Sequence, residues 1–384
     1  MRSNHRQRGT HNGRNGGPVR YAVAGLGYIA QVAVLPAFAH ARKNSRLTTL
    51  ISDDPAKLRL LGDKYGVEHR YSYDDYDDAL KRGEFDAVYI ALPNSMHCDF
   101  TVRAARAGIH VLCEKPMAVT AGECRRMIRA AAAHDVRLMI AYRLHFEAAN
   151  MKAVELAQSG AIGDLRIFNS LFTMSVKSGD IRVKQRLGGG TLYDIGIYCI
   201  NAARYLFRSE PYEGFAWSAN NGERRFREVD EMTAAVLRFP GDRLASFTSS
   251  FGSADTSTFQ IVGTKGHLRL DPAYELAEAL RIESTIGESH RSYSYSKRDQ
   301  FAPELIHFSQ CVQSQANPEP SGEEGLADVR VIEALYESVR RGRPVQIEAL
   351  RRGRRPGPDQ EMHRPPVRRR SLFHARRPSR ATDD

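Results

Sequence analysis

The chain has 384 residues, with 56 lysines and arginines against 45 aspartates and glutamates, and a formal net charge of +11. The excess charge lies at the two ends: residues 1–20 carry five arginines and no acid, and residues 351–384 carry eleven arginines against four acids. The 330 residues between them hold 40 basic and 41 acidic side chains. This distribution argues against a nucleic-acid-binding protein, and no zinc finger or basic stripe with interleaved aromatic residues favours one.

Membrane and metal-binding classes are disfavoured as well. The sequence has no run approaching the roughly 18 apolar residues that a membrane span requires. Residues 1–18 contain no apolar secretory signal, and the five cysteines are scattered without a C-x-x-C pair. We therefore expect a cytoplasmic protein with reduced thiols and no bound metal.

The region from residue 19 to residue 142 alternates strand and helix patterns. Short apolar and β-branched runs predict strands at 19–25, 47–51, 85–92, 109–113 and 137–141. Helical patterns between them cover 30–41, 54–65, 99–107 and 121–134. Such alternation is typical of a parallel sheet with right-handed crossovers. Residues 19–142 are therefore predicted to form a doubly wound Rossmann domain, preceded by a disordered basic arm at 1–18.

The regular alternation of strand and helix patterns ends after residue 142. Helical patterns cover 148–158, 192–205, 303–313 and 322–340, and extended runs cover 165–176, 215–219, 232–239, 244–251, 259–262 and 267–270. Several of these runs alternate polar and apolar residues, as in an antiparallel sheet with one covered face. Residues 143–345 are predicted to form an α+β domain with a mostly antiparallel, open-faced sheet. Residues 346–384 are predicted to be an arginine- and proline-rich tail without a packed element.

A glycine motif follows the first predicted strand. Gly25, Gly27 and Ala30 fit G-x-G-x-x-A, with Tyr28 and Ile29 between them. The first glycine permits a tight turn, the second lets a pyrophosphate approach the backbone, and the alanine allows close helix–strand packing. The motif and its place in a βαβ unit predict a dinucleotide site.

The second strand ends where the adenosine ribose of a dinucleotide would lie. Asp53 there would bind a ribose 2′-hydroxyl and favour NAD, whereas Ser52 with Lys57 would suit a 2′-phosphate and favour NADP. Asp54, which precedes Pro55, is alternatively a helix cap. These residues leave both cofactors open.

Polar groups follow the next two strands. One contains Leu92, Pro93, Asn94 and His97, and the other contains Glu114 and Lys115. Ligands of open α/β sheets bind beyond the carboxyl ends of the strands, so both groups are predicted to face one crevice. Lys115 precedes a proline, which would fix it in a rigid turn where it can orient a substrate oxygen or transfer a proton.

The motifs, in this order and spacing, resemble the Gfo/Idh/MocA oxidoreductases over residues 20–345. The similar segments are AVYIALPNSMH, HVLCEKPMAVT, LMIAYRLHF, LGGGTLYDIGIYCINAARYL and GEEGLADVRVIEALYESVRRGRPV. GGGTLYDIGIY is the most diagnostic, and its tyrosine at position 198, where many relatives have histidine, is similar to the glucose–fructose oxidoreductase branch.

The resemblance implies roles for individual residues. Lys115 would hydrogen-bond the oxygen of the reacting carbon, with Asp194 and Tyr198 as its catalytic partners. Asn94 and His97 would lie by the nicotinamide half of the cofactor. The two residues after the fifth predicted strand, Tyr142 and Arg143, would lie near substrate or nicotinamide.

The residue pattern supports this catalytic set independently. Asp194 and Tyr198 are four apart in a predicted helix and so share one face. The glycines at 188–190 would let the backbone run close to a ligand. A phenol beside Lys115 can take a hydroxyl proton as a hydride leaves, while Asp194 holds a sugar hydroxyl.

The sequence thus predicts a sugar oxidoreductase that transfers a hydride between an aldose or polyol carbinol and NADP, with NAD as the alternative cofactor. A simple pyranose or inositol-type dehydrogenase that releases its cofactor each turnover is one rival. A non-catalytic nicotinamide-binding sensor is another. The resemblance also implies a homodimer or homotetramer formed through the open sheet face, with no nucleic-acid or membrane partner.

Overall fold

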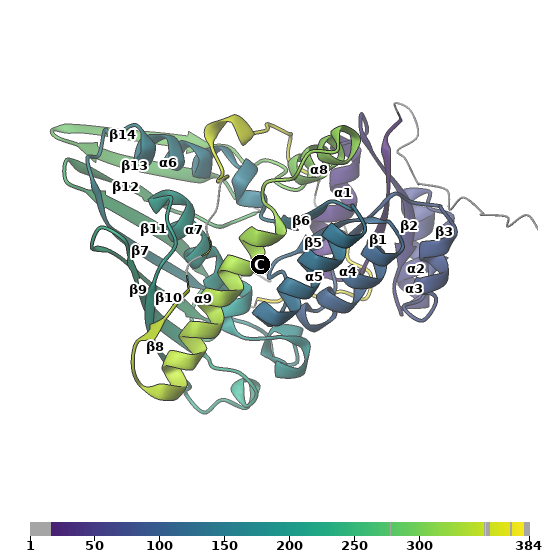
Figure 1. Ribbon diagram of the computed structural model, residues 1–384, viewed down its shortest axis with the longest axis horizontal. Coiled ribbons are helices and arrows are strands. Elements are labelled where there is room, and N and C mark those ends of the chain that lie inside the picture. The colour runs from purple at the N-terminus through teal and green to yellow at the C-terminus, as the bar shows by residue number, and fades with distance from the viewer. Residues whose placement is uncertain (1–16, 277, 349, 351–353, 369–370, 380–384) are drawn as a thin grey trace, which may run out of the picture.

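The computed structural model describes residues 17–379 apart from 277, 349, 351–353 and 369–370. Most of the predicted arm at 1–18 therefore lies outside the described residues. Figure 1 shows two bodies side by side, a helix-flanked sheet near the N-terminus and a larger curved sheet. Within the described residues, no helix is long and apolar enough to cross a membrane.

The first body contains a six-stranded parallel sheet in the order β3-β2-β1-β4-β5-β6. Its strands are β1 (Val19–Ala24), β2 (Ser45–Ile51), β3 (His69–Tyr71), β4 (Ala87–Ile90), β5 (His110–Glu114) and β6 (Leu138–Ala141). All four residues of β4 are buried, as expected for a central parallel strand covered on both faces. The strand order reverses beside β1, which places a ligand crevice at the carboxyl ends of β1 and β4.

The regular helices of this body are α2 (Pro55–Tyr65), α3 (Tyr76–Lys81), α4 (His97–Arg106) and α5 (Ala121–Ala133). Three of them, α2, α4 and α5, were predicted, whereas α3 and the strand β3 before it were not. The helix predicted at 30–41 is instead a π-helical turn (Ala30–Val34), a short α1 (Leu35–Ala37) and a 3-10 turn (Phe38–His40). Pro36 lies within this stretch and has no N–H to donate, so a regular α-helix cannot continue through it.

The second body is built on a nine-stranded sheet in the order β14-β13-β12-β11-β7-β10-β9-β8-β15. Its strands are β7 (Leu165–Thr173), β8 (Glu213–Ala219), β9 (Met232–Phe239), β10 (Arg243–Ser250), β11 (Thr256–Gly263), β12 (Gly266–Leu270), β13 (Leu280–Ile286), β14 (Ser289–Tyr295) and β15 (Val345–Gln346). Every pair is antiparallel except β7 with β10. The sheet is therefore mixed but mostly antiparallel, as predicted.

Helices cover one face of this sheet only. α6 (Ala148–Gln158), α7 (Ile197–Phe207) and α9 (Gly322–Arg341) lie between the sheet and the Rossmann domain, whereas α8 (Ala302–Ser314) packs on β1 and β2 (Figure 1). The opposite face exposes Trp217 at 66% and Ile167, Val236 and Leu244 at 39–46% of their surface. These side chains alternate along their strands with buried ones, so the open face carries an apolar patch.

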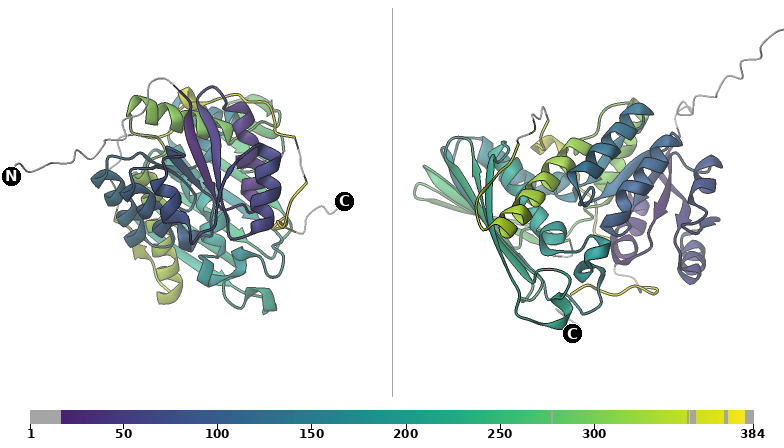
Figure 2. Two further views of the ribbon diagram at one scale, coloured as in Figure 1. Left: turned by 90° about the vertical axis from the view of Figure 1, so that its right-hand side faces the viewer. Right: turned by 60° about the horizontal axis from the view of Figure 1, so that its bottom comes forward.

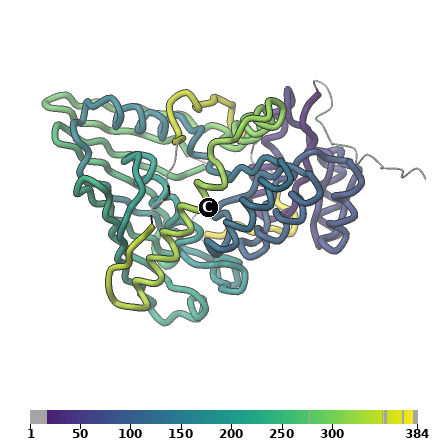
Figure 3. The backbone as a smooth tube through the Cα atoms, viewed as in Figure 1, coloured from purple at the N-terminus to yellow at the C-terminus, as the bar shows by residue number. Residues whose placement is uncertain are grey.

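The described part of the C-terminal tail is packed, which corrects the prediction for residues 346–384. It contains half of β15, a 3-10 turn at Pro358–Gln360 and a β-bridge between Ser379 and Val176. Figure 3 shows this yellow segment lying along the body of the molecule. Its contacts include Glu319 with Gln360, 41 positions apart, and Gln31 with Phe373, 342 positions apart, and local patterning does not reveal either.

A buried ionic network ties α7 to α9. Arg204 is fully buried, and its Nε lies 2.6 Å from Glu210 Oε2 while Nη1 lies 2.7 Å from Glu324 Oε1. Nη1 also pairs with Asp328, which accepts a 2.6 Å hydrogen bond from the Tyr142 hydroxyl. Burial opposes ionisation of Glu210, but Arg204 outweighs it and lowers the pKa of that carboxyl to about 2. Arg204 therefore pairs with three carboxylates inside the second body, and Arg355 pairs with one of them, Glu210.

Replacing this arginine should be strongly destabilising. We expect Arg204→Met to lower the free energy of unfolding by about 3–5 kcal/mol, because it leaves buried carboxylates uncompensated. Urea denaturation measures the change. Arg238→Ala is the control, because Arg238 pairs with Glu213 at an exposed site and its loss should change stability by at most about 1 kcal/mol. Equal effects of the two substitutions would contradict the assignment.

Candidate active site

The two glycines of the G-x-G-x-x-A motif have different structural roles. Gly25 has φ +93°, and a Cβ there would lie 2.3 Å from the carbonyl oxygen of Ala91, so only glycine fits. A Cβ at Gly27 would meet no atom within 4 Å. The loop therefore turns tightly against the end of β4 and leaves open space above its second glycine. Tyr28, Ile29 and Ala30 form the first helical turn behind it, and this cradle fits the pyrophosphate of a dinucleotide.

The residues after β2 form a compact turn. The Ser52 hydroxyl accepts a hydrogen bond from the backbone N–H of Asp54, and Asp53 accepts one from the backbone N–H of Tyr73 at 2.8 Å. Asp54 caps α2 by accepting from the backbone N–H of Lys57, the main cause of the lowered pKa of its carboxyl. Asp54 is thus a helix cap, as the alternative interpretation held. Lys57 Nζ lies 3.9 Å from the Asp54 carboxylate, so the positively charged lysine side chain lies at the predicted ribose end of the crevice.

His97, which the resemblance places by the nicotinamide half of the cofactor, uses both ring nitrogens in contacts within the protein. It is fully buried, with Nδ1 2.8 Å from the carbonyl oxygen of Pro116 and Nε2 2.9 Å from that of Leu92. Burial lowers the pKa of its imidazole. His97 therefore joins the turns that follow β4 and β5. Asn94, beside Pro93, has a similar joining role, because its amide donates to the carbonyl of Gly188.

Glu114 positions the backbone of the neighbouring lysine. Its carboxylate accepts hydrogen bonds from the Tyr89 hydroxyl at 2.8 Å and from the backbone N–H of Lys115 at 3.2 Å. The side chain is buried, and burial raises the pKa of its carboxyl. Glu114 therefore fixes the backbone from which Lys115 projects.

Lys115, Asp194 and Arg182 form an ion cluster between the two bodies. Lys115 Nζ donates a 2.7 Å hydrogen bond to the backbone carbonyl of Asp194 and lies 3.6 Å from its carboxylate. Arg182 Nε donates to the other carboxylate oxygen at 2.6 Å. Burial opposes ionisation of Asp194, but the Arg182 and Lys115 cations outweigh it and hold the pKa of the carboxyl below its usual range. Asp194 is therefore an anion held from two sides at the entrance to α7.

Tyr198 lies beside this cluster. Lys115 Nζ is 4.6 Å from the centre of its ring and the Arg143 guanidinium is 5.1 Å away. The rings of Phe172 and Tyr274 pack against it at 5.5 and 5.7 Å. No described residue hydrogen-bonds the Tyr198 hydroxyl. The phenol is thus positioned by its ring while its oxygen stays available to a ligand.

Tyr142 and Arg143, which the resemblance places near substrate or nicotinamide, have polar partners within the protein. The Tyr142 hydroxyl donates to Asp328, and burial raises the pKa of the phenol. The Arg143 guanidinium bonds the side chain of Gln300 and the carbonyl of Tyr274. Both residues are at least 94% buried.

The glycine loop serves a purpose other than the one predicted. A Cβ at Gly188 would lie 2.7 Å from the Cβ of Asn94, and one at Gly189 would lie 2.4 Å from the carbonyl oxygen of Arg182. Gly190 donates its N–H to that same carbonyl at 2.9 Å. The loop therefore packs against protein and holds Arg182 beside Asp194. Arg182 was not among the predicted site residues, because a lone arginine in a loop carries no periodic signal.

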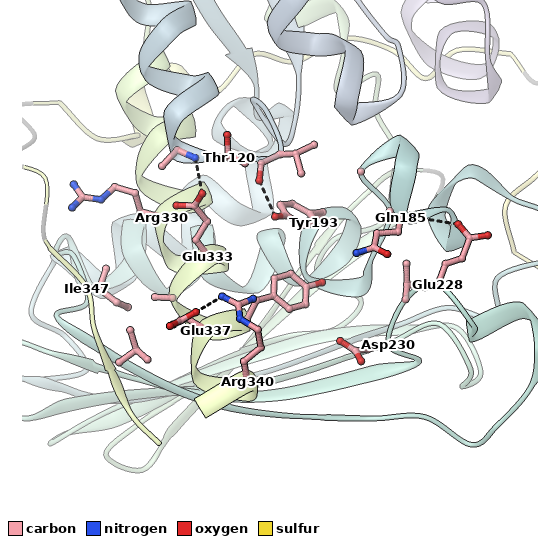
Figure 4. Close-up of a pocket in the computed structure, with 18 of the residues that line it drawn as sticks. Thr120, Gln185, Tyr193, Glu228, Asp230, Arg330, Glu333, Glu337, Arg340 and Ile347 are labelled. Atoms are coloured by element: carbon pink, nitrogen blue, oxygen red, sulfur yellow. Dashed lines mark hydrogen bonds and ion pairs between the residues drawn. The ribbon is translucent and has the colours of Figure 1, made fainter. Parts of the chain in front are cut away.

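An open hollow lies next to this cluster. It is an open cavity of about 1040 Å³ whose lining includes Gln185, Tyr193, Glu333 and Arg340 (Figure 4). Tyr193 precedes Asp194, and its hydroxyl turns to the carbonyl of Val119. The cavity wall contains none of the three predicted catalytic residues, Lys115, Asp194 and Tyr198. Among the described residues, no group of three or more His, Cys, Asp or Glu side chains could hold a metal ion.

A Rossmann domain with a dinucleotide cradle, and a lysine, carboxylate and phenol at the carboxyl edge of its sheet, defines a nicotinamide-dependent oxidoreductase. Residues 19–142 match the model of an oxidoreductase family with an NAD-binding Rossmann fold, and residues 150–269 match the GFO/IDH/MocA C-terminal domain. The chain belongs to the Gfo/Idh/MocA oxidoreductase family.

Three relatives illustrate the family. D-xylose 1-dehydrogenase [NADP(+)] of Haloarcula marismortui is 32% identical over 86% of this chain and 94% of its own length. The structure of aldose-aldose oxidoreductase from Caulobacter crescentus, complexed with glycerol, is 37% identical with a TM-score of 0.82, covering 86% of this chain and all of that one. A 3-ketoreductase mutant from Actinomadura kijaniata, in complex with TDP-benzene and NADP, is 26% identical with a TM-score of 0.77, covering 84% and 98%. These homologues are sugar dehydrogenases and reductases, and NADP is the cofactor named for two of them.

The ion cluster predicts a shifted pH profile for an arginine variant. In Arg182→Met the carboxyl of Asp194 loses its strongest cationic partner, so its pKa should rise by about one unit or more. The acidic limb of kcat/KM should move to higher pH by the same amount, because the carboxylate is then protonated sooner as the pH falls. Arg186→Met, an exposed neighbour, should leave the profile unchanged. An unshifted acidic limb in Arg182→Met would show that Arg182 does not hold Asp194 as an anion.

Proposed function

We propose that the protein is an NADP-dependent sugar oxidoreductase that moves a hydride between an aldose or polyol carbinol and the nicotinamide, as in glucose–fructose oxidoreductase. The observation that carries the proposal is the ion cluster with its adjoining phenol. Lys115 extends from the end of β5, in the domain that holds the pyrophosphate cradle, and meets Asp194 and Tyr198 of the second body. The reacting carbon of a sugar would lie between these two bodies.

Each side chain of the cluster has a part in this reaction. When bound, NADP supplies the hydride acceptor or, as NADPH, the donor. Lys115 Nζ donates a hydrogen bond to the reacting oxygen and so stabilises negative charge that develops there. The Tyr198 hydroxyl gives its proton to that oxygen when a carbonyl is reduced and receives it back when a carbinol is oxidised. The Lys115 and Arg143 cations beside the ring stabilise the charge left on the phenol oxygen.

Asp194 binds substrate in this scheme. Arg182 and Lys115 hold its carboxylate, and 18% of the surface of the side chain remains exposed. A carboxylate accepts hydrogen bonds from sugar hydroxyls, and one held in place loses little conformational freedom on binding. Asp194 would therefore orient the sugar so that the reacting carbon faces the nicotinamide.

The adenosine end supports NADP over NAD. Asp53 accepts a backbone hydrogen bond within its own turn, and Asp54 caps α2, so both carboxylates have partners other than a ribose. The Lys57 ammonium, which lies beside Asp54, is suited to a 2′-phosphate. A transhydrogenating enzyme would keep this cofactor bound between half-reactions, whereas a simple dehydrogenase would release it each turnover. Gel filtration of the purified protein separates the two, because retained nicotinamide favours the first type.

Substitution of the lysine and the phenol tests the mechanism. We expect Lys115→Ala and Tyr198→Phe each to lower kcat by about 100-fold or more, because each removes a proton-transfer or hydrogen-bonding group from the reaction. A screen of aldoses and ketoses with NADP and NAD, followed by the absorbance of the reduced cofactor, identifies the substrate and gives the rate. Tyr193→Phe and Lys152→Ala are the matched controls, since Tyr193 faces the neighbouring cavity and Lys152 pairs with Glu155 on α6.

Two outcomes would redirect the assignment. Unchanged rates in both variants would contradict the proposed roles. Nicotinamide binding without turnover of any sugar would favour the non-catalytic sensor.

We also propose that the protein is a homodimer or homotetramer assembled through the open sheet face. The support is the apolar patch of Trp217, Ile167, Val236 and Leu244 on a face without helices. Trp217→Glu should shift the protein to a smaller species in sedimentation or light scattering, because it places a charge in the centre of an apolar contact. Arg129→Glu on the exposed side of α5 is the control. An unchanged mass in Trp217→Glu would refute this interface.

A cytoplasmic location is the last part of the proposal. All five cysteines are buried and form no disulfide. Buried reduced thiols are typical of proteins kept in a reducing compartment.

A further inference from the structure

The C-terminal tail crosses the outer end of the dinucleotide crevice. We call residues 371–379 the C-terminal strap. Both backbone groups of Phe373 bond to one side chain: its N–H donates to Gln31 Oε1 and its carbonyl accepts from Gln31 Nε2, each at 2.8 Å. The same Nε2 donates to the carbonyl of Leu26 at 2.9 Å. Leu26 lies between the two glycines of the pyrophosphate cradle, so a single glutamine separates the strap from the cradle.

The strap next passes the turn that we assign to the adenosine ribose. The Phe373 ring packs against the Rossmann core with Lys64 Nζ 5.1 Å from its centre. His374 Nδ1 lies 3.0 Å from the Asp54 carboxylate. Asp54 follows Ser52 and Asp53 and pairs with Lys57, so His374 is held at the turn where a 2′-phosphate would lie.

The strap then reaches the second body. The backbone N–H of Lys177 donates to the carbonyl of Pro378 at 2.8 Å, and Ser379 forms a β-bridge with Val176 and donates its hydroxyl to Asp255. His374 and Pro378 are four residues apart, so at most about 14 Å of chain joins the two bodies. Figure 2 (right) shows the yellow segment making this crossing. The strap therefore bridges the crevice near its adenosine end.

The bridging residues carry positive charge. Arg376, which is exposed, lies between the two anchor points with Arg377 next to it, while the body of the chain between the two charged ends is electrically balanced. An NADP molecule carries a pyrophosphate and a 2′-phosphate, and arginine is the side chain best suited to phosphate oxygens. An exposed pair such as His374 with Asp54 contributes little stability, so the strap can open when the cofactor enters.

From these contacts we propose that the C-terminal strap is a cofactor-binding element that closes over the adenosine half of NADP and contributes Arg376 to recognition of its 2′-phosphate. The inference rests on the nicotinamide-binding part of the proposed function and extends it to a segment outside both matched domains. It makes the tail a determinant of cofactor retention and of the preference for NADP over NAD.

Cofactor affinity in a charge-reversal variant tests the recognition step. In the full-length protein, Arg376→Glu should weaken NADPH binding by about tenfold or more and NADH binding by less than threefold, because only NADPH has a 2′-phosphate. Fluorescence titration of each reduced nicotinamide gives the two dissociation constants without any sugar. Arg364→Glu is the matched control, because it makes the same charge change on the tail outside the strap and its side chain bonds only the carbonyl of His363 among the described residues. Equal loss for NADPH in both variants, or no loss in Arg376→Glu, would overturn the recognition role.

A second variant tests the closing step. The double substitution Phe373→Ala with His374→Ala removes both side-chain anchors on the Rossmann domain. It should speed NADPH dissociation by about tenfold in stopped-flow displacement and leave circular dichroism unchanged. Slower release or tighter binding would mean that the strap competes with the cofactor and would overturn the proposal.

The wild-type protein supplies an independent readout. Trypsin cleavage after Arg376, followed by mass spectrometry, should slow when NADP⁺ is bound, because the closed strap shields that bond. Undiminished cleavage with saturating NADP⁺ would contradict closure. A wild-type protein that binds neither nicotinamide would overturn the proposed function and the strap together. Normal NADPH binding without sugar turnover would remove only the catalytic assignment.

Discussion

The arrangement of the two bodies depends on one carboxylate that is held between two cations. Asp194 lies in the π-helical turn that leads into α7, and it pairs with Arg182 of its own body and with Lys115 of the Rossmann domain. In a partly buried site, attraction from both cations exceeds the cost of burying the carboxylate, so the anion persists. The cluster therefore joins the two bodies and at the same time fixes the groups that would face a substrate.

The surrounding structure can be understood as support for that cluster. Glu114 holds the backbone of the lysine, and His97 joins the two strand-end turns beside it. On the other side, the glycine loop brings the Arg182 backbone under Asp194, and a π-helical turn at Leu192–Gly196 leads into α7. π-Helical turns frequently occur at functional sites. The Arg204 network then anchors the far end of α7 to α9.

Much of this arrangement could be predicted from the sequence, because local patterns carry it. The parallel strands are short apolar runs, and their carboxyl ends meet at one edge of the sheet, where the glycine motif follows β1 and Lys115 follows β5. β14 was missed because its sequence, SHRSYSY, is polar and mostly exposed. Irregularity at Pro36 was also missed, although a proline inside a helical pattern was the available signal.

The remaining differences arise from contacts between distant parts of the chain. Tyr142 and Arg143, expected near substrate or nicotinamide, have polar partners in Asp328 and Gln300, more than 150 residues later. The strap contacts Gln31 across 342 residues of sequence, and nothing in the local pattern around Phe373 indicates that partner. Sequence patterns located the neighbourhood of the site, whereas the direction of each side chain depends on packing that only the folded chain defines.

The central claim is that the crevice beside this cluster passes a hydride directly between a sugar carbon and the nicotinamide. A single turnover of wild-type protein with NADP⁺ and an aldose deuterated at C1, followed by mass spectrometry of the NADPH, tests it most directly. The account predicts one deuterium in each NADPH formed. Unlabelled NADPH, with the deuterium released to solvent, would contradict it.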